Sequence, residues 1–513
     1  MNQVKLPAFL QRALLAGAAL FAMCWVIARA WVQSITIDEA DCFLTFVASA
    51  APLHWDPASQ NHLLNTILMR FSTSLFGLSH LTVRAPALIG AAVYILAAYK
   101  LCRLLTADWR LQLSLLLCLV YNPFIMDFLV AARGYSLATA FLMGGLAIAV
   151  EAQAASVAGR SRSLTLTCAL CSICAALSLA ANFAFAFVLA AAMLMLLLWA
   201  FRRPEASKPK ILAACIAPGL LVTLFFSGWA LLRWPQGQLW WGATSLRETL
   251  STIVEASLFE LNPHIVNPLL YPALERLKPI LLPLLGALCA LQFLLIFLNR
   301  SSLRDVPARW LLALAGMLAA MVALSLSAHW LSFRLFGLLL PKGRTGIYLV
   351  PSCMLIAGAA AAFPLASRAG LLCRRAIAVV LFALGGYFLL CLRLAYFHEW
   401  KWDADVRSAY SVVAQYNHNY GVKEVPSGWM YAPSLNFYRH LSGRETLTEF
   451  VKLDKFPVGK RVYVLNAVMD RHFIAEQELK VVYYGGLSHM VVAIRPEVET
   501  AAPCRPCGEA AAR

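Results

Sequence analysis

The stretch "WVQSITIDEADCFLTF", Trp31 to Phe46, decides how the rest of the sequence is interpreted. A long apolar run ends here, and two carboxylates, Asp38 and Glu39, follow at once, with Asp41 behind them. Charged side chains at the edge of a bilayer are costly unless they are solvated or paired, so such residues are functional candidates. A structural role is the alternative, because Asp is a favoured N-cap and the acids could begin a short interfacial helix.

The composition indicates that most of the chain lies in lipid. Of the 513 residues, 61% are hydrophobic and 13% are charged, whereas soluble domains carry roughly 25% charged residues. Apolar runs of about 20 residues, the length that spans a bilayer, recur from Ala13 to Tyr396. We expect about eleven spanning helices, near residues 13–33, 86–106, 111–128, 134–152, 164–182, 183–201, 211–232, 279–298, 308–329, 345–365 and 376–396.

The distribution of basic residues predicts the orientation of these helices. The net charge is +17, and the basic residues cluster in every second connection, at residues 5–12, 100–110, 160–162, 202–210, 300–309 and 368–375. Such loops are typically cytoplasmic. An odd number of spans then places the amino terminus in the cytoplasm and the polar tail outside. This placement of the charge argues against nucleic-acid binding.

The first outer loop, residues 34–85, is predicted to contain two interfacial helices. One begins at "TIDEADCFLTFVASA". The second runs from Asn61 to Gly77 with a 3.6-residue period and is amphipathic, so we expect it to lie along the membrane surface. Its polar face contains His62, Asn65, Thr66, Met69 and Thr73, and its apolar face contains Leu64, Ile67, Leu68, Phe71 and Leu75.

The tail, residues 397–513, reads as a small soluble domain. A helical pattern ends before Gly421, and "RVYVL", "KVVYYG" and "HMVVAI" are typical of strands. Cys504 and Cys507 could pair in an oxidising compartment. The predicted fold is therefore an all-α polytopic membrane domain over residues 1–396, followed by an α/β domain.

Two further outer loops carry polar residues at the membrane edge. Asp127, Arg133 and Tyr135 lie where one predicted span ends and the next begins, and Lys342 and Arg344 lie in "LLPKGRTGIYLVP". Outward cations suit an anionic lipid headgroup, and Arg binds phosphate through a planar fork. The alternatives are that Arg133 only snorkels to the interface and that the other cations contact ordinary anionic lipid.

Carboxylates and phosphate-binding cations on the outer face suit glycosyl transfer from a lipid-linked sugar phosphate. A carboxylate would accept the proton of the acceptor hydroxyl. Because an unperturbed Asp has a pKa of about 3.9, it is a weak base that helps late in the transition state. Cations would stabilise the departing lipid phosphate, and direct displacement would invert the anomeric centre.

An ordered set of motifs resembles the GT-C glycosyltransferases, in particular the branch of protein O-mannosyltransferases and lipid A aminoarabinose transferases. The set comprises "IDEA", "QNHLLNTILMRF", "LFGLSHLTVRAPAL", "VYILAAYKLCRLL", "NPFIMDFLVAARGYSLATAF" and "GRTGIYLVPSCMLI". The resemblance covers the membrane part and is strongest from about Ile37 to Phe141.

The resemblance implies roles for individual residues. Asp38 becomes the general base, with Glu39 and Asp127 as supporting acids. The candidates for binding the donor phosphate are Arg133, Tyr135, Lys342 and Arg344. At His62 the sequence departs from the family motif, because Leu63 and Leu64 replace its prolines, so the role of His62 stays open. Some members of the family bind a divalent cation near the acids and others need none, so the metal also stays open.

The sequence thus predicts an enzyme of the bacterial inner membrane that transfers a hexosyl or pentosyl group from a polyprenyl-phosphate donor. The acceptor, a glycolipid, a glycan or a protein, cannot be read from the sequence. The alternatives are a polytopic transporter or lipid flippase, and a scaffold anchored by its spans. Transporters usually show internal repeats and charges near the midplane, whereas here the charges lie at the outer edge and no repeat is visible.

Overall fold

A computed structural model describes residues 7–49, 58–160, 162–203, 207–234, 237–238, 241–299, 306–365 and 367–500. The predicted pairing of Cys504 with Cys507 and part of the first outer loop, residues 50–57, lie outside these ranges. The chain divides into two compact units. The helical unit comprises Met1–Ile27, Trp55–Asn65 and Ala85–Arg393, and the mixed unit comprises Ala28–His54, Thr66–Arg84 and Leu394–Arg513.

Ten helices within the described ranges are long and apolar enough to cross a membrane, which confirms the predicted polytopic helical fold. They are α1 (Ala8–Val32), α4 (His80–Leu105), α7 (Tyr135–Val157), α8 (Leu164–Ala181), η2 with α9 (Phe183–Phe185, Ala186–Phe201), α10 (Lys208–Leu232), α12 (Tyr271–Leu298), α13 (Val306–Phe336), η4 with α14 (Gly343–Gly346, Leu349–Ala362) and α15 (Arg368–Leu390).

The span expected at 111–128 is divided in the structure. Helix α5 (Trp109–Val120) has 12 residues, and the short helix α6 (Pro123–Phe128) follows it. Asn122 starts the new helix, because its side-chain oxygen accepts the backbone N–H groups of Phe124 at 3.0 Å and Ile125 at 3.3 Å. Pro123 takes the first helical position, where its missing N–H costs nothing.

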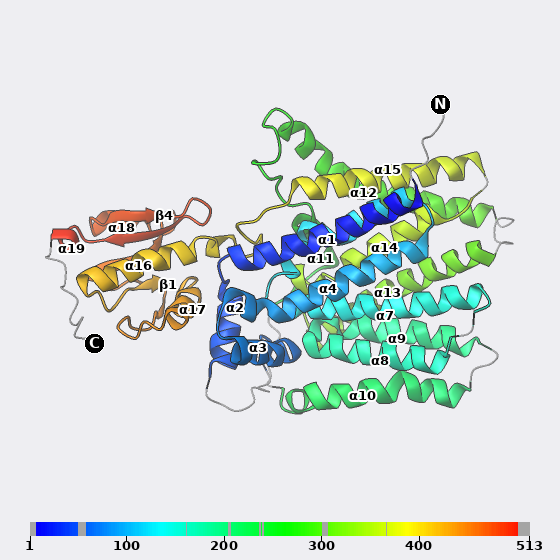
Figure 1. Cartoon of the computed structure of the whole chain (residues 1–513), viewed down its shortest axis with the longest axis horizontal. Coiled ribbons are helices and arrows are strands. Elements are labelled where there is room, and N and C mark those ends of the chain that lie inside the picture. Colours follow the sequence, from blue (N-terminus) through cyan, green and yellow to red (C-terminus); the bar gives the residue numbers. More distant parts are fainter. Residues whose placement is uncertain are drawn as a thin grey trace. The chain divides into compact units, whose positions relative to one another are not determined.

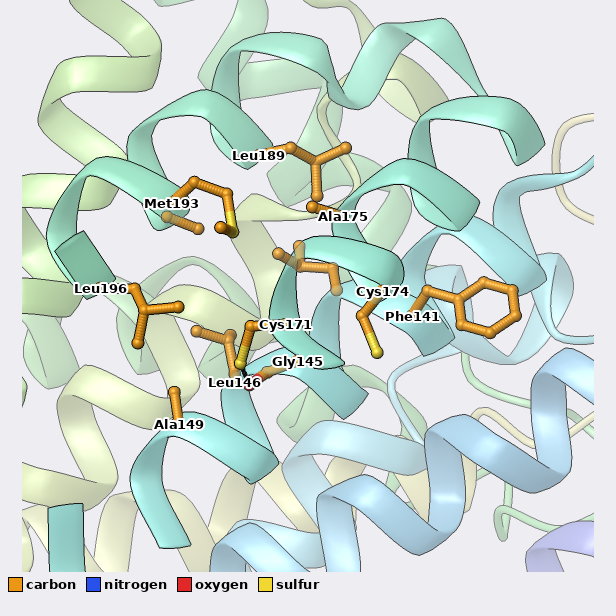
Figure 2. A pocket seen from close by; sticks show the side chains of 12 residues that line it. Phe141, Gly145, Leu146, Ala149, Cys171, Cys174, Ala175, Leu189, Met193 and Leu196 are labelled. Atoms are coloured by element: carbon orange, nitrogen blue, oxygen red, sulfur yellow. Dashed lines mark hydrogen bonds between the residues drawn. The ribbon is translucent and has the colours of Figure 1, made fainter. Parts of the chain in front are cut away.

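Close helix contacts build the helical unit. Helix α8 packs against α7 and α10, and α9 packs against α13, so these helices lie side by side (Figure 1). At the α8–α10 contact the backbone N–H of Gly219 donates to Ser172 Oγ at 2.9 Å. A cavity of about 40 Å³ remains between α7, α8 and α9, lined by apolar side chains such as Phe141, Cys171 and Leu196 (Figure 2). This lining makes it a packing space rather than a candidate for chemistry.

The mixed unit contains the predicted C-terminal sheet, so the α/β expectation is confirmed. The strand order is β2-β1-β3-β5-β4; β1 pairs parallel with β2 and β3, whereas β5 pairs antiparallel with β3 and β4. The bounds are β1 Ser427–Gly428, β2 Lys452–Leu453, β3 Val462–Asn466, β4 Lys480–Tyr484 and β5 Met490–Ile494. Strands β3 and β5 are buried along their whole length.

Short helices accompany this sheet. They are η5 (Lys401–Asp403), α16 (Val406–Tyr420), α17 (Ala432–Ser442), α18 (Arg471–Glu476) and α19 (Glu497–Thr500). Helix α16 ends at Gly421, as predicted, because the φ of +62° at this residue favours glycine. The sequence analysis missed α17, although Pro433 near its start and Gly443 after its end are typical helix boundaries.

Both interfacial helices predicted in the first outer loop are present. The first consists of α2 (Ile37–Cys42) and the π-helical turn η1 (Phe43–Val47), and the second is α3 (Leu63–Phe76). Three polar side chains of α3, Asn65, Thr66 and Ser72, are buried at 0%, 3% and 7% exposure, whereas the apolar Phe71 and Leu75 are 63% and 59% exposed. Leu64, which the sequence placed on the apolar face, is also buried. This arrangement suits a helix with one face toward the protein and the other toward lipid. The remaining helix, α11 (Leu246–Ser257), follows α10.

Candidate functional site

The residues singled out by the sequence fall into two groups, one in each unit. Asp38 and Glu39 belong to the mixed unit and form the acidic group, together with Arg84 and Asp403 of the same unit. The others belong to the helical unit and form the cationic group: His62, Asp127, Arg133, Tyr135, Lys342 and Arg344.

The acidic group begins with a capping box at the start of α2. Thr36 Oγ1 accepts the backbone N–H of Glu39 at 3.2 Å, and Glu39 Oε2 accepts the backbone N–H of Thr36 at 3.0 Å. This reciprocal pair satisfies donors that a helix start leaves without partners. Glu39 is completely buried, whereas Asp38, one residue before it, is only half-buried. Of the two neighbouring acids, Asp38 is therefore the more exposed.

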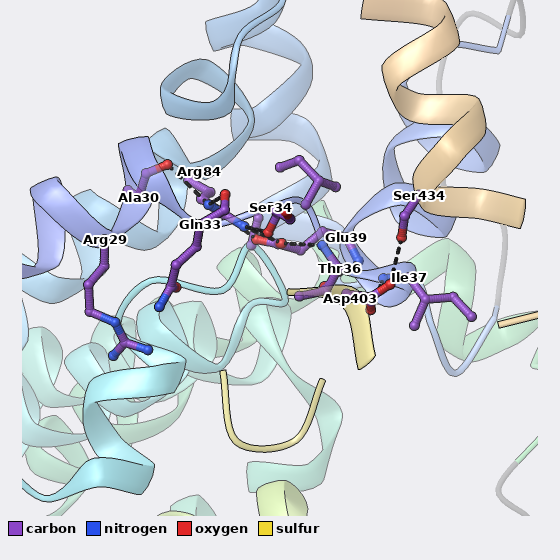
Figure 3. A network of polar contacts seen from close by, with 12 residues as sticks. Arg29, Ala30, Gln33, Ser34, Thr36, Ile37, Glu39, Arg84, Asp403 and Ser434 are labelled. Carbon is purple, nitrogen blue, oxygen red and sulfur yellow. Dashed lines mark hydrogen bonds and ion pairs between the residues drawn. The ribbon is translucent and has the colours of Figure 1, made fainter. Parts of the chain in front are cut away.

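Arg84 holds the carboxylate of Glu39 from the start of α4. Its Nε donates to Oε1 at 2.8 Å and its Nη2 to Oε2 at 2.7 Å, with both side chains fully buried (Figure 3). This bidentate geometry is the strong form of an arginine–carboxylate pair. Breaking it by removal of one partner would leave an uncompensated buried charge.

The remaining N–H groups of Arg84 close the end of α1. Nη1 donates to the carbonyls of Ala30 and Gln33 at 3.0 and 2.9 Å, and Nη2 donates to that of Ser34 at 2.8 Å. The last carbonyls of a helix have no hydrogen-bond donor within the helix. Here the guanidinium of Arg84, which has five N–H donors, donates to them. No such role was predicted for Arg84 from the sequence. Arg84 and Pro86 in the quoted "LFGLSHLTVRAPAL" were the pattern that could have indicated it.

Asp403, from η5, completes the acidic group. Its Oδ2 accepts the backbone N–H of Ile37 at 2.8 Å and its Oδ1 accepts the hydroxyl of Ser434 at 3.1 Å, with the side chain 1% exposed (Figure 3). Burial raises the pKa of Asp403 well above its usual value, and the charges of Asp38 and Glu39 act in the same direction, while the two hydrogen bonds oppose it. No local pattern marks this residue, which lies far along the chain from α2.

The cationic group is built around the start of α7. Gly134 precedes this helix with φ +72°, and a Cβ there would overlap the Ala181 carbonyl oxygen and lie 2.9 Å from His62 Cβ. Only glycine fits this close approach. The Tyr135 ring contacts His62 at 5.5 Å and Phe128 at 4.9 Å between ring centroids.

His62 lies in an electropositive, buried position. Burial, followed by the positive charges of Arg133 and Arg344, lowers the pKa of His62 well below its usual value, while a hydrogen bond with the Ala181 carbonyl opposes this. A neutral imidazole that donates one N–H to a carbonyl has an acceptor at its other nitrogen. Among the described residues, Nε2 has no hydrogen-bond partner. A hydroxyl group of a ligand would suit this acceptor.

The other members of the cationic group are placed differently. Arg344 lies in η4 and is half-buried, and Asp127 is buried in α6. Lys342 Nζ forms an ion pair with Glu248 Oε1 at 2.8 Å and lies 5.3 Å from the centre of the Trp241 ring. The helical unit thus brings His62, Arg133, Tyr135 and Arg344 near one another, whereas Lys342 is engaged by α11. The sequence analysis missed Glu248 and Trp241.

A metal site was left open by the sequence. Within the ranges that the structure describes, no three His, Cys, Asp or Glu side chains converge so that they could hold a metal ion. Glu39 and Asp403 are instead held by Arg84 and by backbone and hydroxyl donors. The described residues therefore show no three-ligand metal cluster of these side chains.

Two solved structures resemble the chain over nearly its whole length. ArnT from Cupriavidus metallidurans in the apo state matches with a TM-score of 0.54 and 14% identity, covering 94% of this chain and 97% of that one. The chain has the ArnT fold. ArnT of the same organism bound to undecaprenyl phosphate matches with a TM-score of 0.52 and 13% identity, covering 95% and 98%. No protein-family model and no curated protein sequence matches the chain. The GT-C-type fold expected from the motifs is thus confirmed in the ArnT fold.

Proposed function

We propose that this chain is a membrane glycosyltransferase that moves a sugar from a polyprenyl-phosphate donor to an acceptor at the outer face of the inner membrane. The observation that carries the proposal is the placement of buried His62 and Arg133 near half-buried Arg344 in a chain with the ArnT fold. An ArnT structure contains undecaprenyl phosphate, which supports the same class of lipid phosphate here. We place the amino terminus in the cytoplasm and the sheet-containing tail in the periplasm, as the basic loops predict, with α5 and α6 together as an eleventh crossing beside the ten long helices of the described ranges.

The cationic group is proposed to hold the donor. Arg133 and Arg344 would bind the phosphate and stabilise the negative charge that grows on it as the sugar departs. Their effect is larger in a buried site than in water, because the effective dielectric constant is lower. Tyr135 would donate a further hydrogen bond, and His62 Nε2 would accept one from a sugar hydroxyl. Lys342 shares its charge with Glu248 and so would act chiefly by fixing the segment that carries Arg344.

Asp38 is proposed to activate the acceptor. The acceptor oxygen attacks the anomeric carbon, its proton passes to the Asp38 carboxylate, and the bond between this carbon and the phosphate oxygen breaks with its electron pair leaving on the phosphate. A single displacement inverts the anomeric centre. The half-buried position of Asp38 supports this assignment. Glu39 would support α2 through Arg84, and Asp127 would act as a supporting acid beside the start of α7.

The test compares envelope glycans of a deletion strain complemented with variants. Mass spectrometry should show one sugar residue missing in the deletion strain and restored by the natural chain. Asp38→Asn should lower transfer about 10²- to 10⁴-fold, the usual contribution of a general base, with unchanged amounts of folded protein in the membrane. Asp41→Asn is the matched control, because Asp41 lies on the same helix in an exposed ion pair with Lys452.

Two results would contradict the proposal. Identical glycan masses in the deletion and parent strains would exclude transfer to the envelope. Full transfer by Asp38→Asn would remove the assigned base. A lipid flippase would give a different result. Its deletion would change how a lipid is distributed between the two leaflets, whereas sugar transfer measured in solubilised membranes would be unchanged.

A further inference from the structure

We propose that Asp403 is a positioning residue for the candidate base: from the C-terminal segment it holds the first turn of α2 and so fixes where Asp38 lies. This inference rests on the proposed function, in which Asp38 accepts the proton of the acceptor. Asp403 belongs to none of the motifs that relate the sequence to the GT-C enzymes, and it acts through another residue rather than on the substrate.

The hydrogen bond of Asp403 lies at the start of α2. Asp403 Oδ2 accepts the N–H of Ile37, the first residue of α2, at 2.8 Å. This N–H is one of the donors that a helix cannot satisfy internally. The bond fixes the peptide unit between Thr36 and Ile37, and Asp38 is the next residue along the chain.

Helix α2 is too short to be stable by itself. The helix has six residues, and isolated helices of this length are not stable in water. Its orientation therefore depends on tertiary contacts. Helix α17 packs against it, and Ser434 at the start of α17 donates to Asp403 Oδ1 at 3.1 Å. Asp403 thus joins the two helices through one buried carboxyl group.

Further hydrogen bonds join the residues that lead into α2 to the C-terminal segment. The hydroxyl of Ser34 donates to the carbonyl of Ala404 at 2.9 Å, and the N–H of Ile35 donates to the Tyr438 hydroxyl at 3.0 Å. The Asp403–Ile37 bond continues this series and is the one next to Asp38. The C-terminal segment therefore binds residues 34–37 almost residue by residue, which leaves α2 little freedom to rotate.

The charge state of Asp403 suits a positioning role. Burial raises its pKa, and Asp38 and Glu39 nearby add to the rise. The raised pKa favours the protonated form of Asp403, which holds the Ile37 N–H without placing another negative charge beside Asp38. Asparagine has the shape of the neutral acid and keeps one acceptor for Ile37.

The test uses the purified full-length chain in nanodiscs, with solubilised membranes of the deletion strain as the source of donor and acceptor. Asp403→Ala should lower kcat at least tenfold with little change in KM, because α2 moves while the donor site is intact. Asp403→Asn should keep kcat within about threefold. Asp403→Glu keeps the carboxyl group but displaces it by one methylene, so it should also lower kcat; it serves where the alanine variant does not accumulate.

Asp405→Ala is the matched control. Asp405 lies two residues away, and its Oδ2 accepts the N–H and hydroxyl of Ser488 at 2.9 and 2.6 Å rather than a group of α2. Its loss should lower thermal stability and leave kcat unchanged. If Asp403→Ala and Asp403→Glu keep full kcat while Asp38→Asn is inactive, the inference fails and the proposed function stands. If Asp403→Asn is as slow as the alanine variant, a neutral positioning role is excluded. Full activity of Asp38→Asn would refute the proposed function itself.

Discussion

The acidic group and the cationic group differ in how their polar atoms are satisfied. In the acidic group Arg84 uses all five N–H donors on Glu39 and three carbonyls, and both oxygens of Asp403 accept hydrogen bonds. In the cationic group His62 Nε2 is buried without a partner among the described residues. The first group is complete by itself, whereas the second contains a buried acceptor that suits a ligand.

This difference separates structural from chemical roles among residues of the same type. Asp38 and Glu39 are neighbours in the sequence, yet Glu39 is enclosed by Arg84 and Asp38 is half-buried. Arg84 and Arg344 are both arginines at the edge of a predicted span, yet Arg84 serves the fold and Arg344 lies near a neutral histidine. Substitutions of Glu39 or Arg84 should therefore change stability first, and those of Arg133 or Arg344 should change ligand binding first.

The largest effect is expected from breaking the Glu39–Arg84 pair. Glu39→Ala leaves a buried guanidinium without its carboxylate, which costs about 3–5 kcal/mol. Thermal or denaturant unfolding of the purified chain would measure this. Glu424→Ala is the control, because its pair with Lys460 is exposed at 60% and 34% and should contribute at most about 1 kcal/mol. Equal losses in both variants would contradict the structural role of Glu39.

An intermediate effect is expected in the cationic group. Arg344→Lys keeps the charge but removes the planar fork that binds phosphate through two hydrogen bonds. Affinity for a polyprenyl phosphate should fall about tenfold or more, since a hydrogen bond to a charged group contributes roughly 1.5–3 kcal/mol, with little change in unfolding. Binding to the chain in nanodiscs would be measured beside Arg247→Lys, an exposed arginine in α11. Unchanged affinity in Arg344→Lys would remove this residue from the donor site.

The smallest effect is a pH dependence of stability that involves Asp403. In the unfolded chain an Asp has a pKa of about 3.9, and burial raises the pKa in the folded chain. As pH rises above the unfolded value, the unfolded chain releases a proton that the folded chain retains, so the folded state loses stability. Asp403→Asn has no such proton. Its thermal midpoint relative to the natural chain should rise between pH 4 and pH 8, and a difference independent of pH would contradict the raised pKa.

Local patterns predicted much of the fold. Ten of the expected spans, the two interfacial helices and strands β3 to β5 follow from periodicity and boundary residues. The prediction of one continuous span at 111–128 was wrong, because Asn122 and Pro123 start a new helix inside the apolar run. Hydropathy alone does not show this boundary. The two-residue strands β1 and β2 were missed because they carry too few residues to show a period.

The sequence by itself determined the membrane-spanning architecture and the placement of acids and cations near the ends of spans, whereas the N-cap of α2 is Thr36 and not the aspartate that the sequence suggested. Each of these depends on residues within a few positions of one another. Only the tertiary structure decided that Glu39 is enclosed while Asp38 is partly accessible, because the enclosing groups lie 45 residues away at Arg84 and, for the start of α2, 366 residues away at Asp403. Burial and hydrogen bonding between such distant residues arise only when the chain folds, and they set which charges remain available for chemistry.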